Sequence, residues 1–153
     1  MFQTAELGPT ITSTASPFIL PDHNNIETQL NDLMGKSGLL LGFIGDIWQP
    51  TSVRRILWLQ RHSIKFTRMG INIALLICDK PHMLYGFYMS TARPLEFPML
   101  ADVDRRVHRQ FNMERYSGLV LLDQDLTITD KWIVPDERVW PKAQELLEAC
   151  RMI

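Results

Sequence analysis

The sequence lacks most of the features that assign a chain to a specialised class of protein. It has two cysteines, Cys78 and Cys150, which are too few for a disulfide framework and show no metal-site spacing. No apolar run approaches the roughly 20 residues of a membrane helix. The N-terminus also lacks the basic start and apolar run of a secretory signal. We therefore expect a cytoplasmic protein without a membrane span.

Residues 1–35 contain no lysine or arginine, and Lys36 is the first such residue in the chain. Residues 1–35 carry four acidic side chains, and since the whole chain has a net charge of −1, the remainder carries +3. This excess is far weaker than the dense basic patch of a nucleic-acid-binding surface. We expect no nucleic-acid partner.

The composition is that of one globular domain, with 153 residues, 46% hydrophobic and 22% charged. Residues 1–22 contain Pro9, Pro17 and Pro21 among Thr and Ser. Because proline removes backbone donors and fixes φ, this segment is predicted to be an extended N-terminal arm. The domain proper would then cover residues 23–153. The arm could pack on the domain or on a partner.

Apolar patterning predicts alternating strands and helices along the domain. Two of the strands are almost continuously apolar, which is typical of a parallel sheet covered on both faces. The predicted order is helix 24–34, strand 38–45, helix 51–69, strand 71–78, an aromatic and Met-rich insertion 82–92, strand 97–101, helix 102–112, strands 118–122 and 127–134, and helix 142–151.

The long helix at 51–69 is predicted to have two distinct faces. Its apolar arc would contain Val53, Ile56, Leu57 and Ile64, with Trp58, Leu59, Phe66 and Met69 beside them. The opposite stripe is basic and comprises Arg54, Arg61, Lys65 and Arg68. This stripe is either a solvated face or a docking strip for an acidic partner.

Three separated segments resemble one known family. They are Phe43–Ser52 (FIGDIWQPTS) at the first strand-to-helix joint, Phe97–Asp102 (FPMLAD) before a later helix, and Gly118–Asp123 (GLVLLD) in a strand. They resemble the alkyl hydroperoxide reductase/thiol-specific antioxidant (AhpC/TSA, redoxin) family of peroxiredoxin-like proteins. The resemblance implies a thioredoxin-like α/β fold, a three-layer α/β/α sandwich with a mixed central sheet.

The same comparison places the differences at the chemical centre. Peroxiredoxins surround the peroxide with Pro, Thr, Cys and Arg, and the matching positions here are Gly45, Gln49, Ser52 and Ser117. In a branch that carries W-C-P-x-C, the two cysteines match Gln49 and Ser52. Family chemistry needs a thiolate at the first turn of the helix, where its pKa is lowered. The resemblance therefore implies that the catalytic thiols have been lost, and no catalytic residue is assigned.

Other reactive groups offer weak substitutes. Cys78 and Cys150 lie in apolar segments and are predicted to be buried structural thiols. Ser52 has no histidine near it in sequence to act as a base. Asp102, Asp104 and His108 could ligate a metal, but Asp102 fits better as a helix cap. We expect no metal and no cofactor.

The leading hypothesis is that the chain acts by binding a protein partner or a small anion at the former active-site turn. The predicted binding residues are Trp48, Gln49, Pro50, Thr51, Ser52, Arg54, Arg55 and Tyr116. The competing interpretation of the turn is that Thr51 or Ser52 simply caps the helix. Two alternative functions are an oxidoreductase that uses Cys78 or Cys150, and a structural subunit or homo-oligomer held by the arm and the aromatic insertion.

Overall fold

A five-stranded mixed sheet forms the centre of the computed structural model, which describes residues 7–134 and 140–153. The central strand pairs in parallel with one neighbour and antiparallel with the other, as predicted for a mixed sheet. The spatial order is β5 (Met99–Ala101), β4 (Ile71–Ile77), β3 (Gly38–Gly45), β6 (Ser117–Asp123) and β7 (Ile128–Val134). Strands β3, β4 and β5 run parallel, so their carboxyl ends meet at one edge of the sheet.

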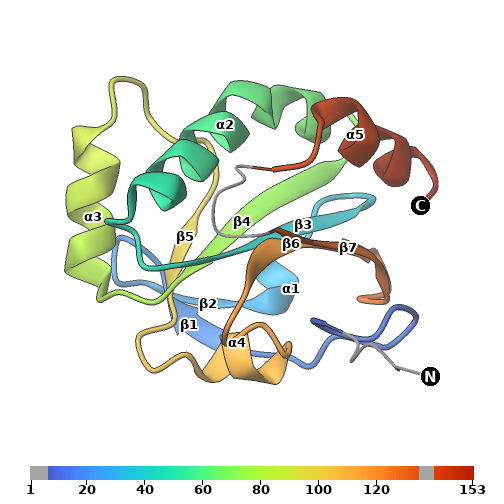
Figure 1. Cartoon of the computed structure of the whole chain (residues 1–153), viewed down its shortest axis with the longest axis horizontal. Coiled ribbons are helices and arrows are strands. Elements are labelled where there is room, and N and C mark those ends of the chain that lie inside the picture. The colour runs from blue at the N-terminus through green and yellow to red at the C-terminus, as the bar shows by residue number, and fades with distance from the viewer. Residues whose placement is uncertain (1–6, 135–139) are drawn as a thin grey trace, which may run out of the picture.

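Helices cover both faces of this sheet, which confirms the three-layer thioredoxin-like architecture (Figure 1). The first layer packs on one face and contains α2 (Pro50–Thr67), α3 (Pro81–Ser90) and α5 (Ala143–Arg151). The second layer contains β1 (Ile19–Pro21), β2 (Glu27–Gln29), α1 (Leu30–Leu33) and α4 (Arg106–Gln110). The insertion predicted at 82–92 is thus mostly the helix α3.

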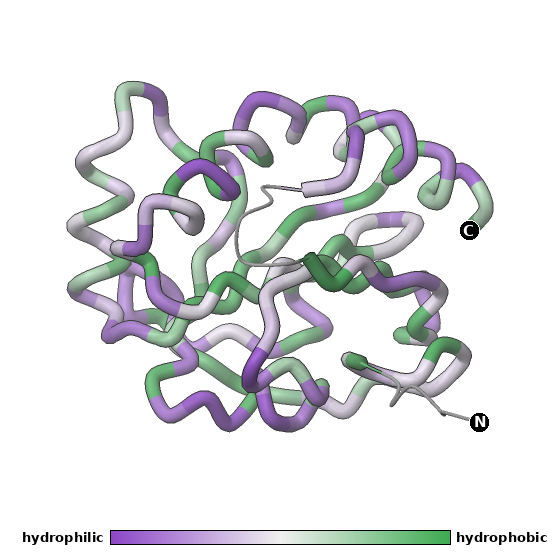
Figure 2. The backbone as a smooth tube through the Cα atoms, viewed as in Figure 1, coloured by the Kyte–Doolittle hydropathy of each residue, from purple (hydrophilic) through white to green (hydrophobic). Residues whose placement is uncertain are grey.

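Alternate residues of β3 enter the two cores. Leu40 and Ile44 belong to the core beneath α2, whereas Leu39, Leu41 and Phe43 belong to the core beneath α4. Because both faces are covered, the strand needs no polar alternation. Figure 2 shows mostly hydrophobic residues along the central strands, whereas α2 and α5 carry both hydrophobic and hydrophilic residues.

The helix predicted over residues 24–34 is largely wrong. A turn occupies its start, because the Asp22 carboxylate accepts the N–H groups of Asn24 (2.8 Å) and Ile26 (2.9 Å). Asn25 adopts a left-handed φ of 60° within this turn. The chain then forms β2, and only the single turn α1 is helical. Local side-chain hydrogen bonds thus outweighed the apolar spacing.

The faces of α2 are rotated from the predicted arc. Leu57 and Ile64 are 38% and 50% exposed, whereas Arg55 is buried. The aromatic side chain of Trp140 covers Arg55, since its Nε1 donates to the Arg55 carbonyl (3.0 Å) and the guanidinium lies 5.3 Å from its ring centroid. The residues that face the sheet are Ser52, Ile56, Leu59, Ser63 and Phe66. The basic stripe of Arg54, Arg61, Lys65 and Arg68 is exposed, as a solvated face requires.

The described part of the N-terminal arm packs on the domain itself. Thr14 forms a β-bridge with Thr127, and the Thr12 N–H donates to the Ile128 carbonyl (2.8 Å). Farther back, the Lys131 Nζ donates to the Pro9 carbonyl (2.8 Å). None of the helices within these described residues is long and apolar enough to cross a bilayer.

Candidate functional site

A polar cavity of about 470 Å³ lies where β3 ends and α2 begins. The loop before β6 closes its other side. Its lining residues are Ile44, Gly45, Asp46, Gln49, Thr51, Ser52, Arg55, Arg105, Glu114, Arg115, Tyr116 and Ser117. The cavity is of the size that small-molecule sites have.

The four positions matched to peroxiredoxin chemistry, namely Gly45, Gln49, Ser52 and Ser117, all line this cavity. The hydroxyls of Ser52 (3.4 Å) and Ser117 (3.5 Å) donate to the same acceptor, the carbonyl of Ile44. No cysteine or histidine is among the described residues that line it. The described lining therefore offers no thiolate, and neither serine has a neighbouring base that could activate its hydroxyl as a nucleophile.

The backbone at Gly45 departs from the family pattern as well. Its φ is +77°, in the left-handed region that glycine adopts freely. Proline is fixed near −65° and cannot take this conformation. The register between β3 and β4 shifts at the same point, between Phe43 and Gly45. The proline of the family motif is therefore incompatible with this turn.

Among the described residues that line the cavity, Arg55, Arg105 and Arg115 are basic, and Asp46 and Glu114 are acidic. Arg105 is held in a left-handed conformation (φ 62°), and its Nη1 donates to the Glu114 carbonyl (3.0 Å). The Glu114 carboxylate instead faces Arg109 at 3.4 Å. Arg55 lies against Trp140, and Arg115 makes no ion pair within the described residues.

The first turn of α2 contributes backbone amides to the same cavity. Gln49 is the N-cap and makes no side-chain capping bond, so the alternative in which Thr51 or Ser52 caps the helix is wrong. Pro50 at the first helical position has no N–H group. The amides of Thr51 and Ser52 have no acceptor inside the helix. They add to the positive end of the helix dipole at this cavity.

The sequence comparison decides the family at this point. The model of the AhpC/TSA family matches residues 11–137. The chain belongs to the AhpC/TSA family.

Solved structures agree on the fold of this AhpC/TSA protein. Peroxidoxin BcpB from Mycobacterium tuberculosis is 17% identical, with a TM-score of 0.81 over 95% of this chain and 98% of that chain. The mitochondrial 2-Cys peroxiredoxin from Plasmodium falciparum is 15% identical, with a TM-score of 0.75 over 94% and 93%. The reduced 2-Cys peroxiredoxin of Plasmodium vivax is 15% identical, with a TM-score of 0.82 over 94% and 81%. A search of curated proteins finds no match to the chain.

The predicted binding residues of this AhpC/TSA protein divide into two groups. Those that line the cavity are Gln49, Thr51, Ser52, Arg55 and Tyr116, and those outside its lining are Trp48, Pro50 and Arg54. Trp48 is 51% exposed and packs edge-on against Phe87 of α3, with ring centroids 6.2 Å apart. Arg54 is exposed and reaches back to the Thr51 hydroxyl (3.5 Å). Sequence analysis did not select Arg105 and Arg115, which only the folded chain brings to the cavity.

The two thiols lie elsewhere. Cys150 is buried in the core beneath α5, as predicted, and burial raises its pKa to about 11. Cys78 is only partly buried, contrary to prediction, and stands 3.6 Å from the His108 ring nitrogens. Burial raises the pKa of Cys78 to about 12. At neutral pH both thiols are therefore protonated.

Asp102 is not the N-cap residue that the sequence predicted, because α4 begins at Arg106 and its N-cap is Arg105, but the Asp102 carboxylate still binds amides of the first turn. The carboxylate accepts the N–H of Val107 (3.0 Å), the N–H of His108 (2.7 Å) and the Nδ1–H of His108 (2.7 Å). Burial by itself would raise the pKa of Asp102, but these hydrogen bonds hold it below its usual value. Asp104 does not join this group and instead accepts the Arg106 N–H (3.1 Å).

Cys78 takes the place beside Asp102 and His108 that sequence analysis considered for Asp104. The sequence contains a signal that could have predicted this proximity of Cys78 and Asp102. Cys78 and Asp102 each come directly after a buried strand, and the carboxyl ends of neighbouring parallel strands share one edge.

Proposed function

We propose that this AhpC/TSA protein binds a small anion in the cavity at the start of α2 and does not perform thiol chemistry there. One observation carries the proposal. The four positions matched to the peroxide site line one polar cavity together with arginines and first-turn residues of α2, and no described lining residue is a cysteine. Arginine and free amides at a helix start are the groups that bind phosphate and carboxylate.

Each group has a distinct role in this proposal. The amides of Thr51 and Ser52 would donate to the anion along the axis of α2. Arg115 would supply a charge-assisted hydrogen bond from the loop before β6, and Arg105 would do so from the turn before α4. A partner protein that presents a carboxylate or phosphate would use the same donors, which unites the two binding hypotheses.

The alternative functions find less support. An oxidoreductase that uses Cys78 or Cys150 would need a thiolate at neutral pH, and burial raises both pKa values to about 12 and about 11. An assembly subunit would use the arm to reach a neighbour, yet residues 12–14 of the arm bond to residues 127 and 128 of the same chain.

Calorimetric titration with inorganic phosphate tests the proposal. We expect saturable binding by the full chain, weakened at least about tenfold in Arg115→Ala, because a charge-assisted hydrogen bond is worth about 1.5–3 kcal/mol.

The matched control is Arg54→Ala. It removes the same charge from an exposed side chain of α2 that does not line the cavity. Its affinity for phosphate should stay within about twofold of the native value, because an exposed charge without direct contact to the anion contributes little. Equal weakening in both variants, or no binding by the native chain, would contradict the proposal.

A further inference from the structure

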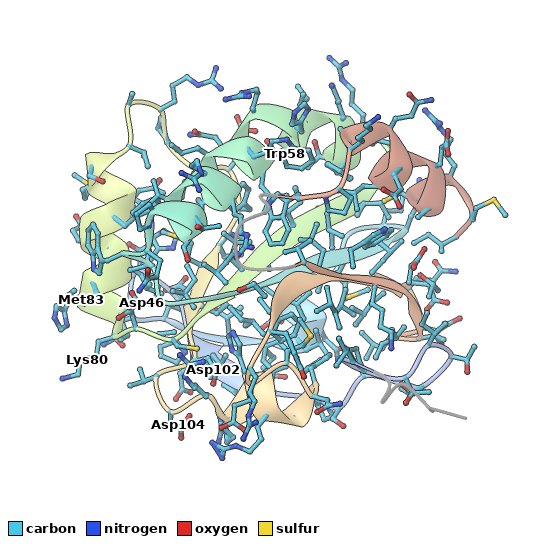
Figure 3. All side chains as sticks on the ribbon, viewed as in Figure 1. Asp46, Trp58, Lys80, Met83, Asp102 and Asp104 are labelled. Carbon is cyan, nitrogen blue, oxygen red and sulfur yellow. The ribbon has the colours of Figure 1, made fainter. Side chains whose placement is uncertain are left out.

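A second cluster of reactive groups lies at the carboxyl ends of the parallel strands, outside the anion cavity. Strands β3, β4 and β5 end in register at Gly45, Ile77 and Ala101. The next residue of β4 is Cys78, whose N–H donates to the Gly45 carbonyl (2.7 Å). The next residue of β5 is Asp102, whose N–H donates to the Ile77 carbonyl (2.8 Å). Figure 3 shows Asp46 and Asp102 at this same end of the sheet.

The side chain of His108 completes the cluster from α4. The thiol of Cys78, the imidazole of His108 and the carboxylate of Asp102 each offer an atom within 4.8 Å of the other two. His108 and Asp102 are fully buried, and Cys78 is partly exposed. Solvent therefore approaches the cluster from the side of the thiol.

Hydrogen bonding fixes what the imidazole can offer. His108 Nδ1 lies 2.7 Å from Asp102 Oδ2, and as donor to this carboxylate it leaves the lone pair on Nε2. A carboxylate behind a histidine in this way is the usual support of a metal-binding imidazole. Oxygen and nitrogen ligands of one tetrahedral ion would stand about 3.3 Å apart, so Asp102 is the support of His108 rather than a ligand beside it.

The thiol and the imidazole are close enough to share one ion after the thiol turns toward the ring plane. Cys78 Sγ lies 3.6 Å from Nε2 of His108. Bonds of about 2.3 Å to sulfur and about 2.0–2.1 Å to nitrogen, at a tetrahedral angle, place the two ligand atoms about 3.6 Å apart. Sγ is equally far from Nδ1 (3.6 Å) and so lies over the ring. Ligation requires it to move into the ring plane, and partly exposed Cys78 is the least confined member of the cluster.

The charges around Cys78 favour a cation. The carboxylates of Asp102, Asp79 and Asp46 act on the Cys78 thiol electrostatically, and so does the Arg105 guanidinium. Within the described residues, acidic groups therefore outnumber basic ones around Cys78, which favours a cation there. A coordinated thiol loses its proton outright, since the charge of the ion reverses the local preference.

We propose that Cys78 Sγ and His108 Nε2 bind a Zn²⁺-type cation, with Asp102 orienting the imidazole and water completing the coordination. On binding, the Cys78 S–H bond breaks, its proton passes to solvent, and a sulfur–metal bond forms. Two protein ligands and an open side make this an exchangeable site rather than a closed structural one.

Titration of the full chain with Co²⁺, a spectroscopic substitute for Zn²⁺, tests the site. Thiolate ligation gives charge-transfer absorption in the near ultraviolet, and we expect it to saturate at one ion per chain and to disappear when Zn²⁺ is added. Cys78→Ser should abolish this absorption, and Cys150→Ser, which removes the other buried thiol, should retain it. Asp102→Asn should weaken binding about 10–100-fold while keeping the same spectrum, as loss of an outer-shell partner does.

A second readout needs no substitution. Zn²⁺ should slow alkylation of Cys78 by iodoacetamide at least tenfold, measured by mass spectrometry, and leave the rate at Cys150 unchanged. The proposal is overturned if the native chain gives no thiolate–Co²⁺ absorption, if Cys78→Ser gives the same absorption, or if Zn²⁺ protects neither thiol.

Discussion

At the scale of single residues, the cavity beside the turn between β3 and α2 combines a buried and a half-buried serine with a left-handed glycine. Ser52 and Ser117 turn their hydroxyls to one carbonyl, that of Ile44, and neither has a base beside it. Gly45 holds the end of β3 in a left-handed conformation that proline cannot adopt. Restoring one cysteine would therefore not restore the whole constellation.

The conformation of Gly45 gives a prediction at this scale. A Cβ added at Gly45 meets no atom within 4 Å, so Gly45→Ala introduces backbone strain without a clash. We expect it to lower the free energy of unfolding by about 1–2 kcal/mol, measured by urea denaturation.

Gly86 in α3 is the matched control for this substitution. A Cβ at Gly86 is equally free of contacts, but Gly86 lies inside a helix and its φ is not positive. Gly86→Ala should instead stabilise the protein by about 0.5–1 kcal/mol, because alanine favours the helix. A similar effect of the two substitutions would mean that the turn at Gly45 is not strained for other residues.

At the scale of elements, α2 is the part that positions the cavity. Its amino end supplies Gln49, Thr51 and Ser52 to the lining, and its length packs on the sheet through Ile56, Leu59 and Phe66. Movement of this helix would displace the amides and Arg55 together.

The buried face of α2 can be tested with two substitutions. Phe66→Ala should cost about 3–5 kcal/mol of unfolding free energy, because Phe66 is fully buried beneath the helix. Ile64→Ala, two residues earlier and 50% exposed, should change stability by no more than about 0.5 kcal/mol. Urea denaturation measures both. A larger loss of unfolding free energy in Ile64→Ala would mean that Ile64 is buried, as sequence analysis predicted.

Sequence reasoning succeeded where burial dominates and failed where local or long-range contacts decide. The apolar runs of β3 and β4 located the parallel strands correctly because both faces of the sheet are covered. The helix predicted at 24–34 failed because Asp22 binds nearby amides and forms a turn. The burial of Arg55, which sequence analysis named only as a binding residue, could not be foreseen because its cover, Trp140, lies 85 residues away in sequence.

About half of the candidate site could be predicted from the sequence. Its first half, Gly45 to Ser52, is continuous in sequence and carries the family motif. Its second half, with Arg105 and Arg115, comes from loops that only the sheet order brings beside α2. The pairing of Cys78 with His108 likewise depends on which strands are neighbours.

At the scale of the whole molecule, the chain has the layers and the mixed sheet of an AhpC/TSA domain, and the positions matched to the peroxide site hold Gly45, Gln49, Ser52 and Ser117. The parallel strands β3, β4 and β5 bring the two proposed sites to one end of the sheet. One is the cavity at α2, which is lined by arginines, and the other is Cys78 with the carboxylates of Asp46, Asp79 and Asp102 near it. The described part of the arm packs on the domain, where Thr14 bridges to Thr127 and Asp22 bridges to Leu100 of β5.

Peroxide turnover by the purified chain tests the central claim most directly. Hydrogen peroxide consumption with a thiol reductant should not exceed the uncatalysed rate for the native protein, whereas a Gln49→Cys/Ser52→Cys variant should gain a thiol of lowered pKa at the start of α2 and react faster than Cys78 or Cys150. Turnover by the native protein that is lost in Cys78→Ser or Cys150→Ser would contradict the account and assign the reaction to a relocated thiol.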